Sequence, residues 1–323
     1  MDHNLLEIKD LYVQYTADGR AVEAVNGITI TVKKGDTLGL VGETGAGKTT
    51  TALAIMGLVP DPPGKVTSGE ILLNGENLLQ KSAKDMRTIR GKDIAMIFQD
   101  PMTSLNPVLP VGDQIREVIL LHEKLSKAEA THKACQMLEL VGIPAERYDE
   151  YPHQFSGGMK QRVIIAIALA CNPKLLIADE PTTALDVTIQ AQVLEMMRDL
   201  KEKYGTAMIL ITHDLGVVAE VCNNVAIMYA GQIVESGTLD DIYSDPQHPY
   251  TIGLFRSIPD LTSKQRRLEI IPGIMPDPSN LPKGCNFCTR CQYATERCKQ
   301  EKPPVAQLSK SHAVLCWRNA EQE

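Results

Sequence analysis

The feature that most constrains the fold is a glycine-rich octapeptide between an apolar strand and a helix. Residues 42–49, GETGAGKT, match the phosphate-binding pattern GxxxxGK[ST]. Thr37–Val41 is predicted to be the preceding strand and Thr49–Met56 the following helix. Glycines let the backbone approach phosphate oxygens closely, and N–H groups at the start of the helix then face those oxygens. The sequence therefore predicts a nucleotide site in an α/β fold.

The residue types of this loop indicate how it would hold a nucleotide. Lys48 supplies a cation for the β- and γ-phosphates, and the hydroxyl of Thr49 can ligate magnesium. The residues expected to contact ATP here are Gly42, Glu43, Thr44, Gly45, Ala46, Gly47, Lys48, Thr49 and Thr50.

Two carboxylates follow a second apolar strand, Leu175–Ala178. At the carboxyl edge of a parallel sheet, Asp179 can hold the magnesium ion. Glu180 is the candidate base that polarises an attacking water, and such a base contributes about 10²–10⁴-fold in rate. The alternative is a strand end with two solvated acids, which the phosphate-binding pattern elsewhere in the chain disfavours.

The remaining hydrophobic patterns predict antiparallel strands followed by a mostly parallel α/β sheet. Alternation over residues 5–35 is typical of paired strands joined by turns. Core strands are predicted at Ile94–Phe98, Leu175–Ala178, Ala207–Thr212 and Val225–Tyr229. Helical patterns cover Val111–Leu140, with a capping box at Ser126 and Glu129, and also Gly157–Cys171 and Thr188–Tyr204. Prolines become frequent after Gly237, which indicates a domain boundary near residue 240.

Composition excludes some classes of protein. The 33 Lys+Arg against 40 Asp+Glu give a net charge of −7, which argues against a basic nucleic-acid surface. The longest apolar run, Val163–Cys171, is about half of the roughly 18 residues that suggest a membrane span. The N-terminus has no basic start followed by an apolar stretch, so we expect a cytosolic chain without a secretory signal.

Five of the eight cysteines fall within residues 285–316. In a cytosolic chain, such a cluster suggests metal binding before it suggests disulfides. The first three have the spacing Cys-x2-Cys-x2-Cys, as in bacterial ferredoxins, but four thiolates serve zinc equally well. The spacing does not say which four bind; the candidates are Cys285, Cys288, Cys291, Cys298 and Cys316.

Residues 155–162, FSGGMKQR, resemble the signature sequence of ABC ATPases, which normally reads LSGGQ, and lie just upstream of the Asp179–Glu180 strand. The resemblance covers about residues 5–240. It implies a nucleotide-binding domain at 1–240, with a RecA-like core, an antiparallel β subdomain and a helical subdomain at about 101–165. Phe155 and Met159 depart from the usual leucine and glutamine.

The resemblance assigns further roles. Gln99 matches the Q-loop glutamine, which contacts magnesium and water and couples to the membrane subunits. His213 matches the switch histidine that steadies the γ-phosphate. Asp186, in Ala184-Leu185-Asp186, matches the D-loop.

Adenine and the second subunit complete the implied site. Tyr15 is expected to stack on adenine, with Tyr12 as the alternative. In this family the signature residues contact the γ-phosphate bound to the opposite subunit of a dimer. Here these are Ser156, Gly157 and Gly158.

The C-terminal part resembles the same region of ATPase subunits from dipeptide and oligopeptide importers. The resemblance lies in residues 243–258, YSDPQHPYTIGLFRSI, and in residues 272–298, PGIMPDPSNLPKGCNFCTRCQYATERC. It implies a small Cys-rich C-terminal domain at 241–323, with a 4Fe–4S cluster in segment 285–316. The implied ligands are Cys285, Cys291, Cys298 and Cys316, with Cys288 as an alternative ligand and zinc as an alternative metal.

Together these resemblances imply an ATP-hydrolysing subunit of a peptide importer, peripheral on the cytoplasmic face of the cell membrane. Its expected partners are two transmembrane permease subunits, a homologous ATPase subunit (a heterodimer in the transporter, with a homodimer as the alternative in isolation) and, indirectly, an extracytoplasmic peptide-binding protein. No nucleic acid is expected. A nickel or other small-solute importer is the alternative. A soluble ABC protein acting on nucleic acid or ribosomes is disfavoured by the single cassette, and a regulatory module without ATPase activity by the intact catalytic residues.

Overall fold

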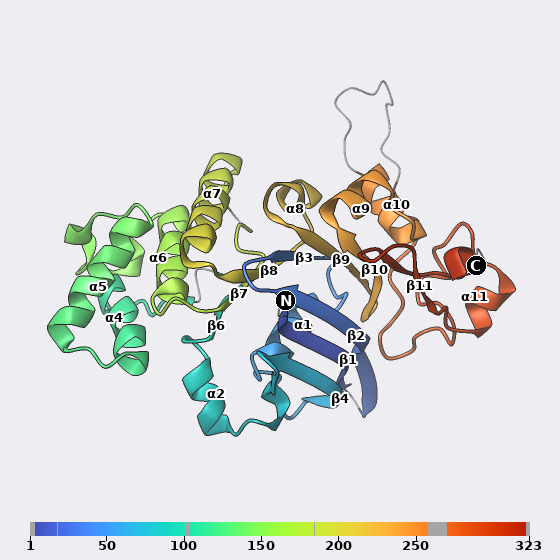
Figure 1. The fold of residues 1–323 in the computed structure, drawn as a ribbon, viewed down its shortest axis with the longest axis horizontal. Helices are drawn as coiled ribbons and strands as arrows, with labels where there is room; N and C mark the ends of the chain where they lie inside the picture. Colours follow the sequence, from blue (N-terminus) through green and yellow to red (C-terminus); the bar gives the residue numbers. More distant parts are fainter. Residues whose placement is uncertain (1–3, 18, 101–103, 184, 258–269, 321–323) are drawn as a thin grey trace. The chain divides into compact units, whose positions relative to one another are not determined.

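The computed structural model describes residues 4–17, 19–100, 104–183, 185–257 and 270–320 (Figure 1). The chain divides into two compact units. The helical unit comprises Met1–Leu5, Val32–Thr37 and Asn77–Ile211. The phosphate-loop unit comprises Leu6–Thr31, Leu38–Glu76 and Thr212–Glu323, and so joins residues from both ends of the chain.

One sheet of the phosphate-loop unit is formed by the N-terminal strands. In the order β2-β1-β4, these are β2 (Arg20–Lys33), β1 (Asn4–Ala17) and β4 (Gly64–Leu73), with the short β5 (Glu76–Asn77) beside β4. β1 and β4 are antiparallel, and Tyr15 lies opposite Gly64. The predicted strands of residues 5–35 are therefore confirmed.

The other strands of this unit carry the phosphate loop. Their order is β11-β12-β10-β9-β3. The last two strands in this order, β9 (Asn224–Tyr229) and β3 (Thr37–Val41), are parallel. The rest is antiparallel: β10 (Gln232–Thr238), β12 (Ala313–Leu315) and β11 (Val305–Gln307). Two strands from the C-terminal end, not predicted from the sequence, thus extend this sheet.

The helices of the phosphate-loop unit are short. They are α1 (Lys48–Ile55), α8 (Leu215–Val221), α9 (Leu239–Ser244), α10 (Pro249–Arg256), α11 (Glu296–Gln300) and α12 (Trp317–Ala320). α9 packs on β10 (Figure 1). A capping box between Thr238 and Asp241 begins α9. The residues directly after β10 therefore pack back against that strand.

The helical unit contains the parallel strands β6 (Ile94–Ile97), β7 (Leu175–Asp179) and β8 (Ala207–Thr212), in the order β8-β7-β6. All residues of these strands are buried, which explains their nearly uninterrupted apolar sequences. The predicted parallel strands are confirmed, with two differences at their ends: the first ends one residue earlier than expected, at Ile97, and the second one residue later, at Asp179. Phe98 lies outside the first strand and is 43% exposed.

Helices make up most of the rest of this unit: α2 (Ala83–Ile89), α4 (Val111–His122), α5 (Lys127–Leu140), α6 (Gly157–Leu169) and α7 (Val187–Tyr204). Single 3-10 turns lie at Leu78–Gln80, Ala145–Arg147 and Pro152–Gln154. The pattern over Val111–Leu140 is two helices rather than one, because Ser126 and Glu129 form the predicted capping box at the start of α5. α4, α5 and α6 pack on one another (Figure 1).

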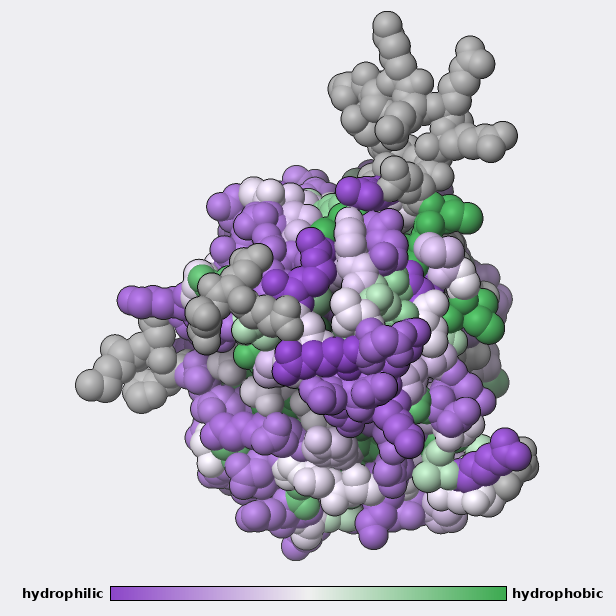
Figure 2. Space-filling view, turned by 90° about the vertical axis from the view of Figure 1, so that its right-hand side faces the viewer, coloured by the Kyte–Doolittle hydropathy of each residue, from purple (hydrophilic) through white to green (hydrophobic). Residues whose placement is uncertain are grey.

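The surface agrees with the charged composition. Figure 2 shows a mostly hydrophilic face on which hydrophobic side chains occur in small separate groups. Among the residues that the structure describes, no helix is long and apolar enough to cross a membrane.

Candidate functional site

The phosphate loop connects β3 to α1, and its glycines are sterically required. Gly47 has a φ of 105°, and a Cβ there would lie 2.3 Å from the carbonyl oxygen of Ala24. A Cβ on Gly42 would lie 2.1 Å from the carbonyl oxygen of Met228. Side chains at either position would collide with backbone, so the loop can follow this path only with glycine.

Lys48 is held by the loop that it follows. Its ammonium donates hydrogen bonds to the carbonyl oxygens of Gly42 (2.6 Å) and Glu43 (3.0 Å), and the residue is buried. Thr44, Gly45 and Thr49 are exposed around it, Ala46 is buried, and Glu43, Gly47 and Thr50 are partly exposed. The predicted loop residues therefore form an accessible turn at a helix N-terminus, a place suited to anions.

Tyr15 and Tyr12, the two candidates for stacking on adenine, differ in their surroundings. The ring of Tyr15 lies against Gly64, where a Cβ would approach ring carbon Cε1 to 2.6 Å. Tyr12 is 40% exposed, and its hydroxyl lies over Gly27. Each tyrosine therefore lies against a glycine that leaves room for it, and Tyr15 is the less exposed of the two.

In the helical unit, the end of β7 brings together three of the predicted catalytic and magnesium-binding residues. Asp179 is the last strand residue and is 2% exposed. Glu180 follows directly, and its Oε2 accepts a hydrogen bond of 2.8 Å from Nε2 of Gln99, which follows the neighbouring strand β6. The parallel pairing of β6 and β7 explains this proximity, since both strands end at the same edge.

The backbone at Glu180 is unusual. Its φ is +46°, which is rare for a residue with a side chain. Its N–H donates to the carbonyl oxygen of Ile211 (2.9 Å), and its Oε2 also accepts a hydrogen bond from Oγ1 of Thr183 (3.1 Å). Such backbone conformations cost about 1–3 kcal/mol of folding free energy and occur often at functional sites. The direction of the Glu180 carboxylate is therefore set by a backbone conformation that destabilises the fold locally.

The segment that resembles the ABC signature begins α6. Ser156 is the N-cap, and its Oγ accepts a hydrogen bond from the N–H of Met159. The guanidinium of Arg147 lies 4.3 Å from the ring centroid of Phe155 and 3.3 Å from Sδ of Met159. The two departures from the usual signature are therefore packed against one arginine, and Gly157 and Gly158 follow the cap directly.

Two further predicted residues lie at element ends. Asp186 caps α7 through a hydrogen bond from the N–H of Ile189 (3.0 Å), and His213 is exposed just after β8. Ala184 lies outside the described residues.

The structure thus groups the predicted residues in two sets. The phosphate-loop unit contains residues 42–50, Tyr15 and His213; the helical unit contains Gln99, Asp179, Glu180, Asp186 and residues 156–158.

All five clustered cysteines line one small cavity in the phosphate-loop unit. Phe287, Pro303 and Trp317 also line it, so its wall is largely apolar. Burial raises the pKa of four of these thiols, those of Cys285, Cys288, Cys291 and Cys316, and raises that of Cys285 to about 12. Among the described residues, no group of three or more His, Cys, Asp or Glu side chains is arranged to hold a metal ion.

The sequence did not predict a set of contacts to the phosphate loop from the C-terminal half of the chain. Arg290, between two of the clustered cysteines, forms an ion pair of 2.9 Å with Glu43. The hydroxyl of Tyr250 accepts a hydrogen bond from the backbone N–H of Glu43 (3.0 Å). The only available signal was the placement of Arg290 within the cysteine run, and that does not identify its partner.

Comparison with known proteins places this geometry in a family. Residues 25–183 match the ABC transporter family, and residues 234–298 match the C-terminal region of oligopeptide/dipeptide transporters. The oligopeptide transport ATP-binding protein OppD of Bacillus subtilis is 55% identical over 97% of this chain and 88% of its own length. The chain belongs to the ATP-binding proteins of ABC peptide transporters. The dipeptide transport ATP-binding protein DppD of the same bacterium is 51% identical over 97% of this chain and 94% of its own length.

Solved structures agree on the ABC cassette fold. The ATP-binding cassette MJ0796, a dimer in a post-hydrolysis state bound to ADP and Pi, is 25% identical, with a TM-score of 0.66. The alignment covers 72% of this ABC protein and 98% of that chain. The cbiO1 protein of Clostridium perfringens, part of the ABC transporter complex cbiONQ, is 27% identical, with the same TM-score, over 79% and 96% of the two chains.

Proposed function

We propose that this ABC ATPase binds and hydrolyses ATP to power import of di- or oligopeptides across the cytoplasmic membrane. The observation that carries the proposal is the combination, in one chain, of the ABC transporter match and the C-terminal match to oligopeptide/dipeptide transporters. Relatives named as oligopeptide and dipeptide transport ATP-binding proteins, more than half identical over nearly the whole chain, support the same substrate class.

In the proposed site the phosphate loop binds the nucleotide, with Lys48 neutralising the β- and γ-phosphates and Tyr15 stacking on adenine. Thr49, Asp179 and Gln99 would hold a magnesium ion, which neutralises charge on the phosphates when bound. Their oxygen donors suit that ion. Glu180 accepts a proton from the attacking water, and His213 steadies the γ-phosphate.

The remaining proposed contacts lie outside this chain. Residues 156–158 would contact the γ-phosphate held by a second, homologous ATPase subunit, with Asp186 at the same dimer interface. The pair would bind two permease subunits at the cytoplasmic face of the membrane, which receive peptide from an extracytoplasmic binding protein. Residues 1–240 would form the nucleotide-binding domain and residues 241–323 a C-terminal domain.

For the C-terminal domain we propose a 4Fe–4S cluster on Cys285, Cys291, Cys298 and Cys316, with Cys288 as an alternative ligand and zinc as an alternative metal. The five cysteines line one apolar-walled cavity and supply thiolates, which suit either metal, and a bound metal would deprotonate its ligands. Iron, acid-labile sulfide and zinc should be measured in anaerobically purified protein. About four iron and four sulfide per chain support the cluster; one zinc without sulfide replaces it with a structural zinc site.

Transport is the direct test of the function. The chain would be reconstituted in proteoliposomes with its permease and ATPase partners and the peptide-binding protein, and uptake of a labelled dipeptide and a labelled pentapeptide measured with ATP. Uptake that is lost with Glu180→Gln supports the proposal. ATP-dependent uptake of nickel without peptide uptake would assign the alternative small-solute importer.

A further inference from the structure

We propose that Arg290 is a positioning residue for the phosphate loop, which fixes Glu43 and neutralises its charge beside the nucleotide. The cysteine-bearing loop, residues 285–291, would thereby set the affinity of the chain for ATP. This inference rests on the proposed nucleotide site and adds a residue that lies far from it in the sequence.

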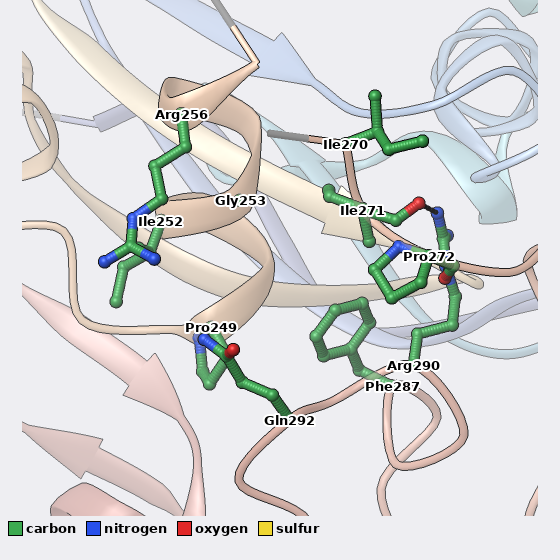
Figure 3. Close-up of a pocket in the computed structure, with 10 residues that line it drawn as sticks. All are labelled: Pro249, Ile252, Gly253, Arg256, Ile270, Ile271, Pro272, Phe287, Arg290 and Gln292. Atoms are coloured by element: carbon green, nitrogen blue, oxygen red, sulfur yellow. Dashed lines mark hydrogen bonds between the residues drawn. The ribbon is translucent and has the colours of Figure 1, made fainter. Parts of the chain in front are cut away.

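The guanidinium of Arg290 is almost enclosed. Its side chain is 5% exposed, and Nη1 lies 2.9 Å from Oε2 of Glu43 and 3.3 Å from the hydroxyl of Tyr229. Nε donates to the carbonyl oxygen of Pro272 (3.0 Å), and Figure 3 shows the side chain extended towards Ile271 and Pro272. Because these contacts fix the arginine from several sides, the position of Glu43 is fixed with it.

Glu43 in turn is connected to Lys48. Its backbone N–H donates to the hydroxyl of Tyr250 (3.0 Å), and its carbonyl oxygen accepts a hydrogen bond from the ammonium of Lys48 (3.0 Å). A shift of Glu43 would therefore move both the start of the loop and an acceptor for the phosphate-binding lysine.

The cysteine-bearing loop has two sides. On one side, its three cysteines line the small cavity that all five clustered cysteines share. On the other side, Asn286 donates a hydrogen bond to the carbonyl oxygen of Ala230 (2.9 Å). The next residue along, Gly231, donates its N–H to the carbonyl oxygen of Ala46 in the phosphate loop (2.9 Å). Asn286 and Arg290 therefore reach the phosphate loop by two routes from the same short segment.

The ion pair between Arg290 and Glu43 also changes the charge beside the proposed nucleotide site. Glu43 is an acidic residue in a loop proposed to surround a triphosphate, and like charges in a partly desolvated site repel strongly. With Arg290 present, the pair is neutral. Without it, the carboxylate stays unmatched at 32% exposure, next to the place where phosphate binds.

A purely structural role and the proposed role predict different outcomes for paired substitutions. Arg290→Met keeps much of the volume but leaves Glu43 charged, so the Kd for Mg-ATP should rise about tenfold, within the usual range of coupling between sites. Glu43→Gln alone should raise it at most about threefold, because the amide keeps the length and a hydrogen bond. The double variant Arg290→Met/Glu43→Gln should bind better than Arg290→Met and recover to within about threefold of wild type.

The measurement is titration of the full chain with a fluorescent ATP analogue and magnesium, with a thermal melt of each variant. Lys299→Ala is the control. It removes an exposed cation of the same C-terminal segment, paired with Glu296 on its own helix, and should not change the Kd. Wild-type affinity in Arg290→Met, or a double variant no better than Arg290→Met, overturns the proposal.

If Arg290→Met does not fold, Glu43→Asp replaces it. The aspartate keeps the charge but is one carbon too short for the 2.9 Å contact, so it should bind ATP more weakly than Glu43→Gln. Equal or tighter binding by Glu43→Asp overturns the proposal. The proposed function fails separately, if the wild-type chain binds no ATP or if Lys48→Ala binds it equally well.

Discussion

Glu235 tests how the C-terminal segment is held to β10 within the phosphate-loop unit. The residue lies on β10 and is 1% exposed. Its carboxylate accepts hydrogen bonds from the backbone N–H of Gln247 (2.7 Å) and of His248 (2.9 Å), and it contacts Nε2 of His312 at 2.8 Å. One buried carboxylate thus joins β10, the segment before α10 and the residue preceding β12.

Glu235→Ala removes at once the acceptor of two backbone N–H groups and the partner of His312. A buried donor left without an acceptor costs about 1–3 kcal/mol, and breaking a buried pair by removing one partner costs about 3–5 kcal/mol. We therefore expect a loss of about 4 kcal/mol, a large part of the roughly 5–15 kcal/mol that stabilises a typical folded protein. Glu235→Gln, which keeps the length and an acceptor oxygen, should lose about half as much.

The assay is a thermal melt combined with limited proteolysis, because a chain with two units need not unfold in one transition. For a unit of this size, about 4 kcal/mol corresponds to a fall in Tm of roughly 8–16 °C, with earlier cleavage after residue 240. Glu220→Ala, at an exposed position on α8, is the matched control and should leave both unchanged. A fall below about 2 °C for Glu235→Ala would refute the reasoning.

Three further variants test the proposed chemistry. Glu180→Gln should lower the rate of phosphate release about 10²–10⁴-fold while ATP still binds, and near wild-type hydrolysis would exclude Glu180 as the base. Lys48→Ala should weaken nucleotide binding at least about tenfold, because it removes the cation of the loop; unchanged affinity in the same titration would contradict the site. Cys285→Ser should lose more than about half of the bound iron on anaerobic purification, whereas Cys135→Ser, outside the cluster, should retain it; equal iron in the two would remove Cys285 from the ligand set.

The sequence predicted those parts of the site whose geometry depends on residues next to one another along the chain. The phosphate loop requires glycine where a Cβ would strike the backbone, and the carboxylates follow an apolar strand that could only be buried. Gln99 was assigned only by resemblance; its contact with Glu180 follows from the sheet topology, because parallel strands bring their carboxyl ends to one edge. The exposed Phe98 was missed, because an apolar pattern does not show where a strand ends.

Tertiary structure alone decided how the C-terminal segment is used. Arg290 and Glu43 are 247 residues apart, and nothing in the periodicity of either segment identifies the other as its partner. β12 pairs with β10 through a strand of three residues, too short to carry a pattern of its own. The sequence by itself determined the loop, the strand-end acids and the cysteine spacing, because backbone sterics and strand periodicity act over a few residues. Which of these meet in space depended on packing between distant segments, where side-chain shape and charge are matched only after the chain has folded.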